Sequence, residues 1–136
     1  MSTTVAFQDR FIPDVLAGVK TQTVRRYRQE KAYPRVGDPL LLARLDGETV
    51  VALARCELIQ RCQIDAGGLV RLHPMDGPEA EGWWPIGVYE SERFARRDGF
   101  ANRRAMVTWL SDLYGSLPID GVVLRWGEVE RVALGG

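Results

Sequence analysis

The apolar positions near the N-terminus predict a short strand followed by a short helix. Residues 4–7, TVAF, are typical of a strand, and beyond Asp9 the apolar residues recur at roughly helical spacing. Gly18 stands where a glycine commonly follows the C-terminus of a helix. We therefore expect a helix that ends at Ala17.

The longest apolar segments have the pattern of a β-hairpin. Residues 39–45 and 49–64 are joined by Asp46-Gly47, a pair that supplies the positive φ values of a tight turn. The second run is long enough to bend or bulge near Arg55. Cys56 and Cys62 lie six residues apart in that run, so both point to one face of a strand, and we interpret them as core residues.

The second half of the chain predicts short strands, a long loop and two helices. We expect a short strand within 67–73, a loop rich in Pro and Gly at 73–87, a helix at 91–97, a helix from the capping residue Asn102 to Gly115, and a strand at 121–129. His73 is interpreted as an ordinary loop residue. Strands around a few helices predict a mixed α+β domain with a partly closed sheet.

Composition narrows the class of protein. A chain of 136 residues with 46% hydrophobic residues fits a single domain, 1–136, and a formal net charge of zero leaves nucleic-acid binding to a local basic patch. One histidine and two distant cysteines cannot form a structural zinc site. We find neither a signal peptide nor a membrane-spanning segment, and two unpaired cysteines fit a reduced compartment, so we expect a cytoplasmic protein.

The segment GVKTQTVRRYR, residues 18–28, is the best candidate for chemistry. Lys20 and Thr23 point to opposite faces of a regular strand, and they converge only if the chain turns after Gly18 before the strand begins. A threonine hydroxyl becomes nucleophilic when a base takes its proton. A lysine can be that base if burial and nearby cations, here Arg25, Arg26 and Arg28, favour its neutral form. The alternative interpretation is a solvated lysine beside an ordinary strand threonine.

Other polar and aromatic residues each allow two interpretations. Trp83 or Trp84 could stack on a base or pack in the fold. Arg26 and Arg28 alternate with apolar residues and could contact phosphate or form a solvated face. Asp98, before Gly99, could be an acid in a site or part of a turn between two helices.

Four segments resemble the ASCH domain family. The run RFIPDVLAGVKTQTVR, residues 10–25, contains its pattern G-x-K-x-x-T-x-R as Gly18, Lys20, Thr23 and Arg25. The runs VGDPLLL, RRDGFANRRAMVTWLSDLYG and VLRW, which begin at residues 36, 96 and 123, are similar to its later elements in the same order.

The resemblance implies a PUA-like fold, a small mixed β-barrel with flanking short helices and a cleft that receives RNA or nucleosides. It also implies an amidohydrolase that deacetylates acetylcytidine with a lysine, a threonine and a glutamate. The motif carries the first two onto Lys20 and Thr23. The acid in the matching helical segment is Asp98, one methylene shorter than glutamate, and Glu92 is a weaker substitute.

These observations lead to three functional hypotheses. The first is an amidohydrolase in which Lys20 deprotonates Thr23 or a water, Asp98 relays a proton to the leaving amine, and Arg25 holds the substrate. The second is a module that binds single-stranded RNA through cations such as Arg26. The third is metal-free RNA cleavage in the same cleft. We expect no cofactor, no metal and no membrane partner, and the oligomeric state stays open.

Overall fold

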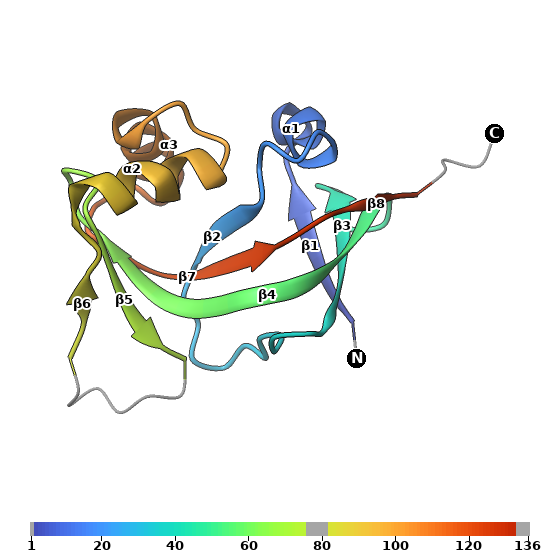
Figure 1. Ribbon diagram of the computed structural model, residues 1–136, viewed down its shortest axis with the longest axis horizontal. Coiled ribbons are helices and arrows are strands. Elements are labelled where there is room, and N and C mark those ends of the chain that lie inside the picture. The colour runs from blue at the N-terminus through green and yellow to red at the C-terminus, as the bar shows by residue number, and fades with distance from the viewer. Residues whose placement is uncertain (1, 76–81, 133–136) are drawn as a thin grey trace.

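The computed structural model describes residues 2–75 and 82–132, which form a bent sheet with three helices on one side of it (Figure 1). The chain begins with β1, Thr3–Phe7, and continues through a 3₁₀ turn into the short helix α1, Ile12–Leu16. Gly18 then adopts a φ of 75°, which ends the helix as predicted.

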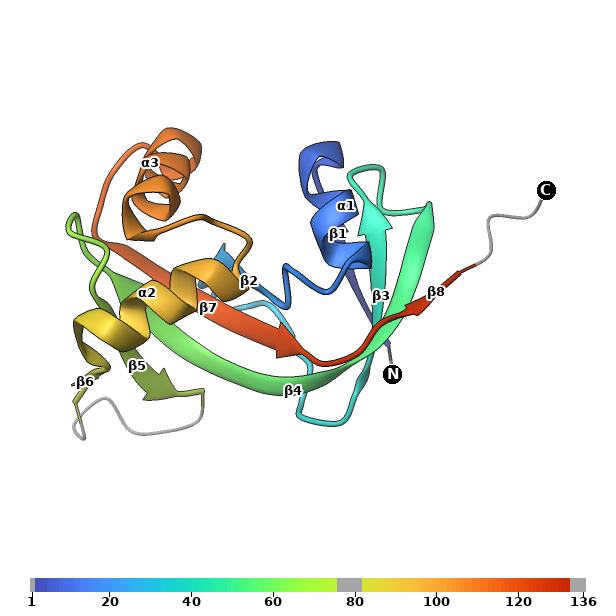
Figure 2. The ribbon, with the colours of Figure 1, turned by 45° about the horizontal axis from the view of Figure 1, so that its top comes forward.

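The strand β4, Val50–Ile64, is the long central strand of the sheet, drawn as the long green ribbon in Figure 2. The strands that surround it are β2 at Gln22–Arg26, β3 at Pro39–Arg44, β5 at Val70–Pro74, β6 at Trp84–Pro85, β7 at Ile119–Trp126 and β8 at Glu130–Arg131. The first half of β4 pairs with β3 and β8, and its second half pairs with β5 and β7. A register shift between Cys56 and Leu58 separates the halves, close to the predicted bulge.

The predicted α+β class is confirmed, whereas closure of the sheet into a barrel is not observed. At one end β1 pairs with β3, and at the other β2 pairs with β7, and no ladder among residues 2–75 and 82–132 joins β1 to β2. A side chain spans this gap instead, because Arg25 Nη2 donates to the carbonyl oxygen of Ala6 at 2.5 Å.

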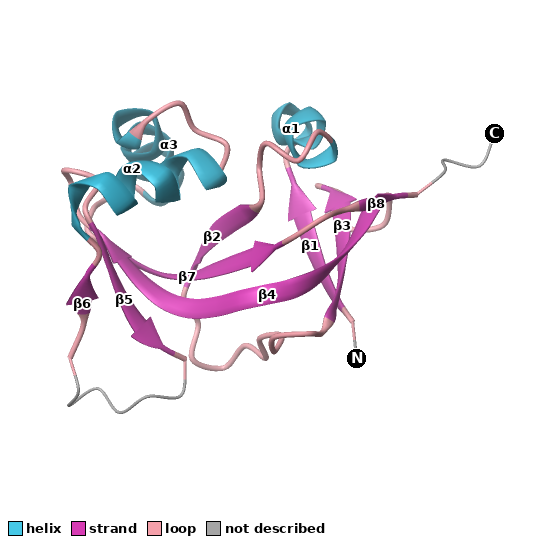
Figure 3. Ribbon diagram, viewed as in Figure 1, coloured by secondary structure: helices cyan, strands magenta, loops and turns pink. Residues whose placement is uncertain are grey.

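The helices α2, Gly87–Arg97, and α3, Arg103–Tyr114, cover one end of the sheet, and all three helices lie on the same side of it (Figure 3). The helix α2 begins at Gly87, four residues before the helix that the sequence predicted at 91–97. The predicted loop at 73–87 is also shorter, because its ends belong to β5 and β6, while residues 76–81 lie outside the described part. His73 is therefore a buried strand residue and not a loop residue, since β5 continues through it and pairs it with Arg61 of β4. Its ring also packs 5.1 Å from that of Trp83.

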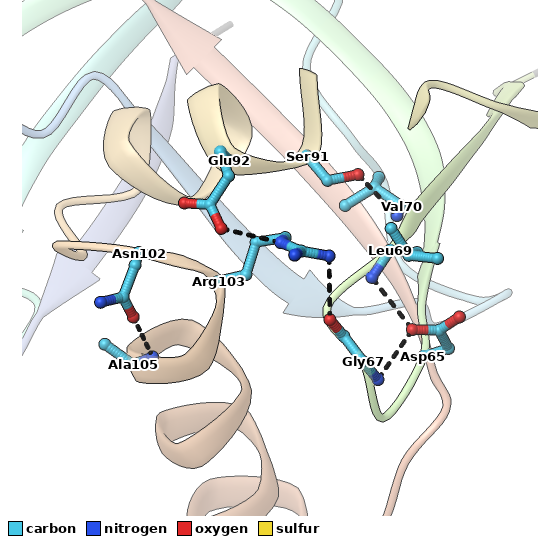
Figure 4. Close-up of polar contacts among 9 residues, drawn as sticks. All are labelled: Asp65, Gly67, Leu69, Val70, Ser91, Glu92, Asn102, Arg103 and Ala105. Atoms are coloured by element: carbon cyan, nitrogen blue, oxygen red, sulfur yellow. Dashed lines mark hydrogen bonds and ion pairs between the residues drawn. The ribbon is translucent and has the colours of Figure 1, made fainter. Parts of the chain in front are cut away.

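Polar contacts fix the two helices to each other and to the turn between β4 and β5 (Figure 4). The side chain of Asn102 accepts a hydrogen bond from the backbone N–H of Ala105, which confirms the predicted cap of α3. Arg103 donates to Glu92 on α2 at 2.8 Å and to the carbonyl oxygen of Gly67 at 3.3 Å. One arginine therefore holds α2, α3 and this turn together.

The core fills the space between the helices and the sheet. Its largest fully buried side chains include Trp126, Leu40 and Met106, and Cys56 and Cys62 are free thiols buried among them, as predicted. Within the described residues, no helix is long and apolar enough to cross a membrane. In the same residues, no group of three His, Cys, Asp or Glu side chains is placed to hold a metal ion.

Candidate active site between β1, β2 and α3

The connection from α1 to β2 brings Lys20 and Thr23 to the same cavity. Gly18 turns the chain, and the backbone N–H of Lys20 donates to the carbonyl oxygen of Asp14 at 3.0 Å. Lys20 thus precedes the strand, and Thr23 lies at its second position. Both side chains line a cavity of about 240 Å³ whose walls also include Arg25 and Asp98.

Lys20 and Asp98 form a buried ion pair inside this cavity. The ammonium nitrogen of Lys20 donates to Oδ1 of Asp98 at 2.8 Å and to its backbone carbonyl oxygen at 2.6 Å. Each residue is only 3% exposed. The same ammonium lies 4.9 Å from the ring centroid of Phe11 and 6.0 Å from that of Phe100, within the range of cation–π attraction. Asp98 is the C-cap residue of α2, as its interpretation as a turn residue between two helices required, and it also lines the cavity.

Burial shifts the pKa values of two charged groups in the site. It raises the pKa of Asp98, and the positive charges of Lys20 and Arg25 oppose that rise without cancelling it. Burial likewise lowers the pKa of Arg25, against the charges of Tyr114 and Asp98. The carboxylate of Asp98 is therefore poorly solvated and is hydrogen-bonded to the ammonium of Lys20.

Arg25, two residues further along β2, holds the side chain of Thr23 by a hydrogen bond. The hydroxyl oxygen of Thr23 accepts this bond from Nε of Arg25 at 3.2 Å, and Thr23 is 5% exposed. The two side chains share a face because they lie two apart on β2. With its other end bonded to Ala6, the guanidinium is held in place beside the hydroxyl.

Aromatic side chains form most of the remaining wall. Phe7, Phe11, Phe100, Trp109 and Tyr114 all line the cavity. They come from β1, the 3₁₀ turn, the α2–α3 connection and α3, so flat apolar surfaces surround the polar group on several sides. Such walls suit a planar, partly apolar ligand with a few polar groups.

Comparison with known proteins identifies the architecture. No protein-family model and no curated protein matches the sequence. Solved structures do match it: an ASCH domain from Lactobacillus crispatus has a TM-score of 0.55 at 14% identity, over 96% of this chain and 80% of that one. The chain has an ASCH-type fold. An ASCH protein from Zymomonas mobilis (TM-score 0.52, 12% identity, 94% and 68% of the two chains) and a protein from Enterococcus faecalis (0.53, 16%, 93% and 74%) are similar to it as well.

In this ASCH-type fold, Lys20, Thr23, Arg25 and Asp98 come together, and the other predicted residues lie elsewhere. Arg26 is exposed, and its guanidinium contacts the carbonyl oxygen and ring of Tyr114 outside the cavity. Arg28 is exposed in the loop after β2. Glu92 pairs with Arg103, so it does not replace Asp98 as the acid of the cavity.

Trp83 and Trp84 belong to the far end of the sheet. Trp84 is 42% exposed on β6, and Trp83 packs against His73 and lies 5.0 Å from the guanidinium carbon of Arg61. Neither tryptophan lines the cavity that contains Lys20. The stacking of either tryptophan on a base therefore stays a prediction, and it concerns a surface outside this cavity.

The aromatic wall is the part of the candidate site that sequence reasoning missed. The sequence suggested Trp109 as a core residue, yet its indole also lines the cavity, with the guanidinium carbon of Arg10 4.6 Å from its ring centroid. The signals were present in the acidic-Gly-Phe run at 98–100 and in Tyr114 near the end of the helix. Nothing local, however, shows that these rings meet Phe7 and Phe11 around one lysine.

Proposed function

We propose that this protein is an amidohydrolase that removes an acyl group from the exocyclic amine of a pyrimidine nucleoside such as acetylcytidine. The supporting observation is the buried constellation of Lys20, Thr23 and Asp98 in one cavity, with the ammonium and the carboxylate 2.8 Å apart. A surface lysine or an ordinary strand threonine would not need to be excluded from water in this way.

The proton path begins with the ion pair. Asp98, whose pKa is raised by burial, accepts a proton from Lys20, and the neutral amine then takes the hydroxyl proton of Thr23 or of a water. The activated oxygen attacks the acyl carbonyl and forms the new C–O bond. When the C–N bond breaks, Asp98 and Lys20 return the proton to the leaving amine. Where Thr23 is the nucleophile, the acyl group remains on its oxygen as an ester, and a water activated by Lys20 then hydrolyses this ester and restores the hydroxyl. One water is consumed in total, and the products are the free amine and a carboxylate.

Arg25 has two roles in this proposal. Its Nε already contacts the hydroxyl oxygen of Thr23, so its charge lies beside the position where negative charge develops on the carbonyl oxygen. Its bond to Ala6 keeps the guanidinium in place before the substrate arrives. The aromatic rings of the wall would receive the base, which is planar.

The experiment follows the release of cytidine from acetylcytidine by chromatography, below the melting temperature of each variant. The chain has two lysines, which supplies a matched pair of variants. We expect Lys20→Met to reduce kcat/KM by at least about 10²-fold, the contribution of a general base. Lys31→Met removes an exposed lysine and should retain turnover. Wild-type protein that releases no cytidine, or equal turnover by the two variants, contradicts the proposal.

A separate observation favours RNA as a second candidate ligand. The rings of Tyr27 and Tyr33 stack at a centroid distance of 6.0 Å, and the guanidinium carbon of Arg61 lies 4.3 Å from the ring centroid of Tyr27 and close to Trp83. Lys31 lies 5.7 Å from the ring of Tyr33. Aromatic rings alternating with cations are typical of surfaces that bind single-stranded nucleic acid.

The two lysine variants also separate this candidate. In an RNA-binding module, Lys31→Met weakens salt-sensitive binding of a single-stranded oligonucleotide, and wild-type protein leaves acetylcytidine intact. If the protein is a metal-free ribonuclease instead, short fragments appear in the presence of a chelator, and Lys20→Met abolishes them.

A further inference from the structure

A second cavity, of about 270 Å³, lies between α2 and the sheet. It shares no lining residue with the cavity that contains Lys20. Its apolar floor comes from several strands and from the helix. Leu58, Leu72 and Ile86 are partly exposed there, and Phe94 and Val123 are buried beneath them. An apolar ligand would therefore remove accessible apolar surface from water.

Two arginines line this cavity beside the apolar floor. Arg97, from the last turn of α2, and Arg125, from β7, both line the cavity. The Nε of Arg125 is buried and has no hydrogen-bond partner within residues 2–75 and 82–132. Burial lowers the pKa of Arg125, and the positive charge of Arg97 lowers it further, against the opposing charge of Glu57. A buried donor without an acceptor, repelled by a second cation, calls for an anion.

The shape of these groups selects the class of anion. Guanidinium groups bind planar carboxylates through paired hydrogen bonds. Glu90 also lines the cavity, and its negative charge disfavours a dianion such as a phosphate monoester. We propose that the cavity beneath α2 is a binding site for an organic monocarboxylate with a short apolar body. Arg97 directly precedes Asp98 in the chain, but the two cavities share no lining residue, and the proposal does not depend on the hydrolase activity.

The test is a titration of ¹⁵N-labelled protein with sodium hexanoate, at constant ionic strength, followed by amide chemical shifts. We expect saturable shifts centred on α2, β4 and β7. Arg97→Gln should weaken binding by about 10-fold to 100-fold, as expected for a lost charge-assisted hydrogen bond. Arg96→Gln is the matched control, because it removes the same charge from an exposed position of the same helix and should bind like wild type.

Three further measurements make the result decisive. Lys20→Met should still bind hexanoate, which excludes the other cavity as the site. Hexanol, without the charge, and hexyl phosphate, with a second charge, should each bind about tenfold or more weakly than hexanoate. The proposal is overturned if the wild type shows no saturable shifts, if Arg97→Gln binds like Arg96→Gln, or if hexyl phosphate binds more tightly than hexanoate. Because Arg97 is a partly exposed helix residue, its variant tests the site even if the corresponding change at Arg125 prevents folding.

Discussion

The ion pair of Lys20 and Asp98 makes a quantitative prediction about stability. Each residue is 3% exposed, so removing one partner leaves the other charge in a site that water hardly reaches. Breaking a buried pair in this way typically costs about 3–5 kcal/mol. For Asp98→Leu we expect the lower end, about 3 kcal/mol, because the ammonium keeps its bond to the backbone carbonyl of residue 98 and its contact with Phe11. In a chain of this length that loss corresponds to a fall of about 10 °C in Tm.

The double variant Lys20→Met/Asp98→Leu should recover most of this loss. Both replacements are apolar and similar in volume to the originals, and replacing a buried pair by apolar residues is often neutral. Guanidinium unfolding of the wild type, the two single variants and the double variant gives a double-mutant cycle. We predict a coupling free energy of about 2 kcal/mol or more. A double variant that loses the sum of the two single losses would refute the view that the two charges stabilise each other.

The stability of the Lys20→Met variant should depend on pH in a defined direction. Without the ammonium, which lowers the pKa of Asp98, burial raises that pKa further above its ordinary value of 3.8. The folded state then retains a proton that the unfolded state has lost. The contribution of Asp98 to the stability of the variant should therefore be fully present below about pH 4 and be lost as the pH rises through the folded pKa, by at most about 1.4 kcal/mol per pH unit. A difference from wild type that does not widen with pH contradicts the burial of this carboxylate.

Three smaller predictions test the framework around the site. Asn102→Ala removes the cap of α3 and should cost about 1 kcal/mol in urea unfolding, whereas Asn102→Ser should cost little. Gly68→Ala should cost at least about 1–2 kcal/mol by the same measurement, because Gly68 has a φ of +78° and a Cβ there would lie 2.9 Å from the Cβ of Arg103; a neutral effect would contradict this close contact. Cys62 is buried, and burial raises the pKa of its thiol, so a thiol reagent should modify it only at the rate of unfolding, and fast labelling of the native protein would exclude that burial.

Local chemistry explains which parts of the fold were predictable. The hairpin between β3 and β4, the cap at Asn102 and the helix end at Gly18 each depend on residues close in sequence, and all three are confirmed. The turn of the hairpin differs in detail, because Gly47 alone of the Asp-Gly pair has a positive φ and Asp46 accepts hydrogen bonds from the backbone N–H groups that follow it. The early start of α2 and the burial of His73 were missed. The strand β6 pairs with β5 just before α2 begins, and Trp83, next to β6, packs on His73. A two-residue strand leaves almost no periodic signal in the sequence.

The candidate site was predictable in its polar part and not in its walls. A glycine, a lysine and a threonine at fixed spacing suggested convergence, and Gly18 provides the turn it requires. The acid comes from 78 positions further along the chain, and the aromatic rings come from four separate segments. Contacts of that range are set by how the helices pack on the sheet, which no short pattern records. The barrel implied by the family resemblance is likewise not observed, since no ladder among the described residues joins β1 to β2 and the side chain of Arg25 spans that gap.

The most direct measurement compares three side chains at position 23. Acetylcytidine turnover is measured for the wild type, for Thr23→Ser, which retains an oxygen at this position, and for Thr23→Val, which retains the shape without it. If the hydroxyl of Thr23 acts in the reaction, the serine variant should stay within about 10-fold of wild type, and the valine variant should lose at least about 10²-fold in kcat. Equal turnover by the serine and valine variants, both folded, would contradict the assignment of chemistry to this cavity.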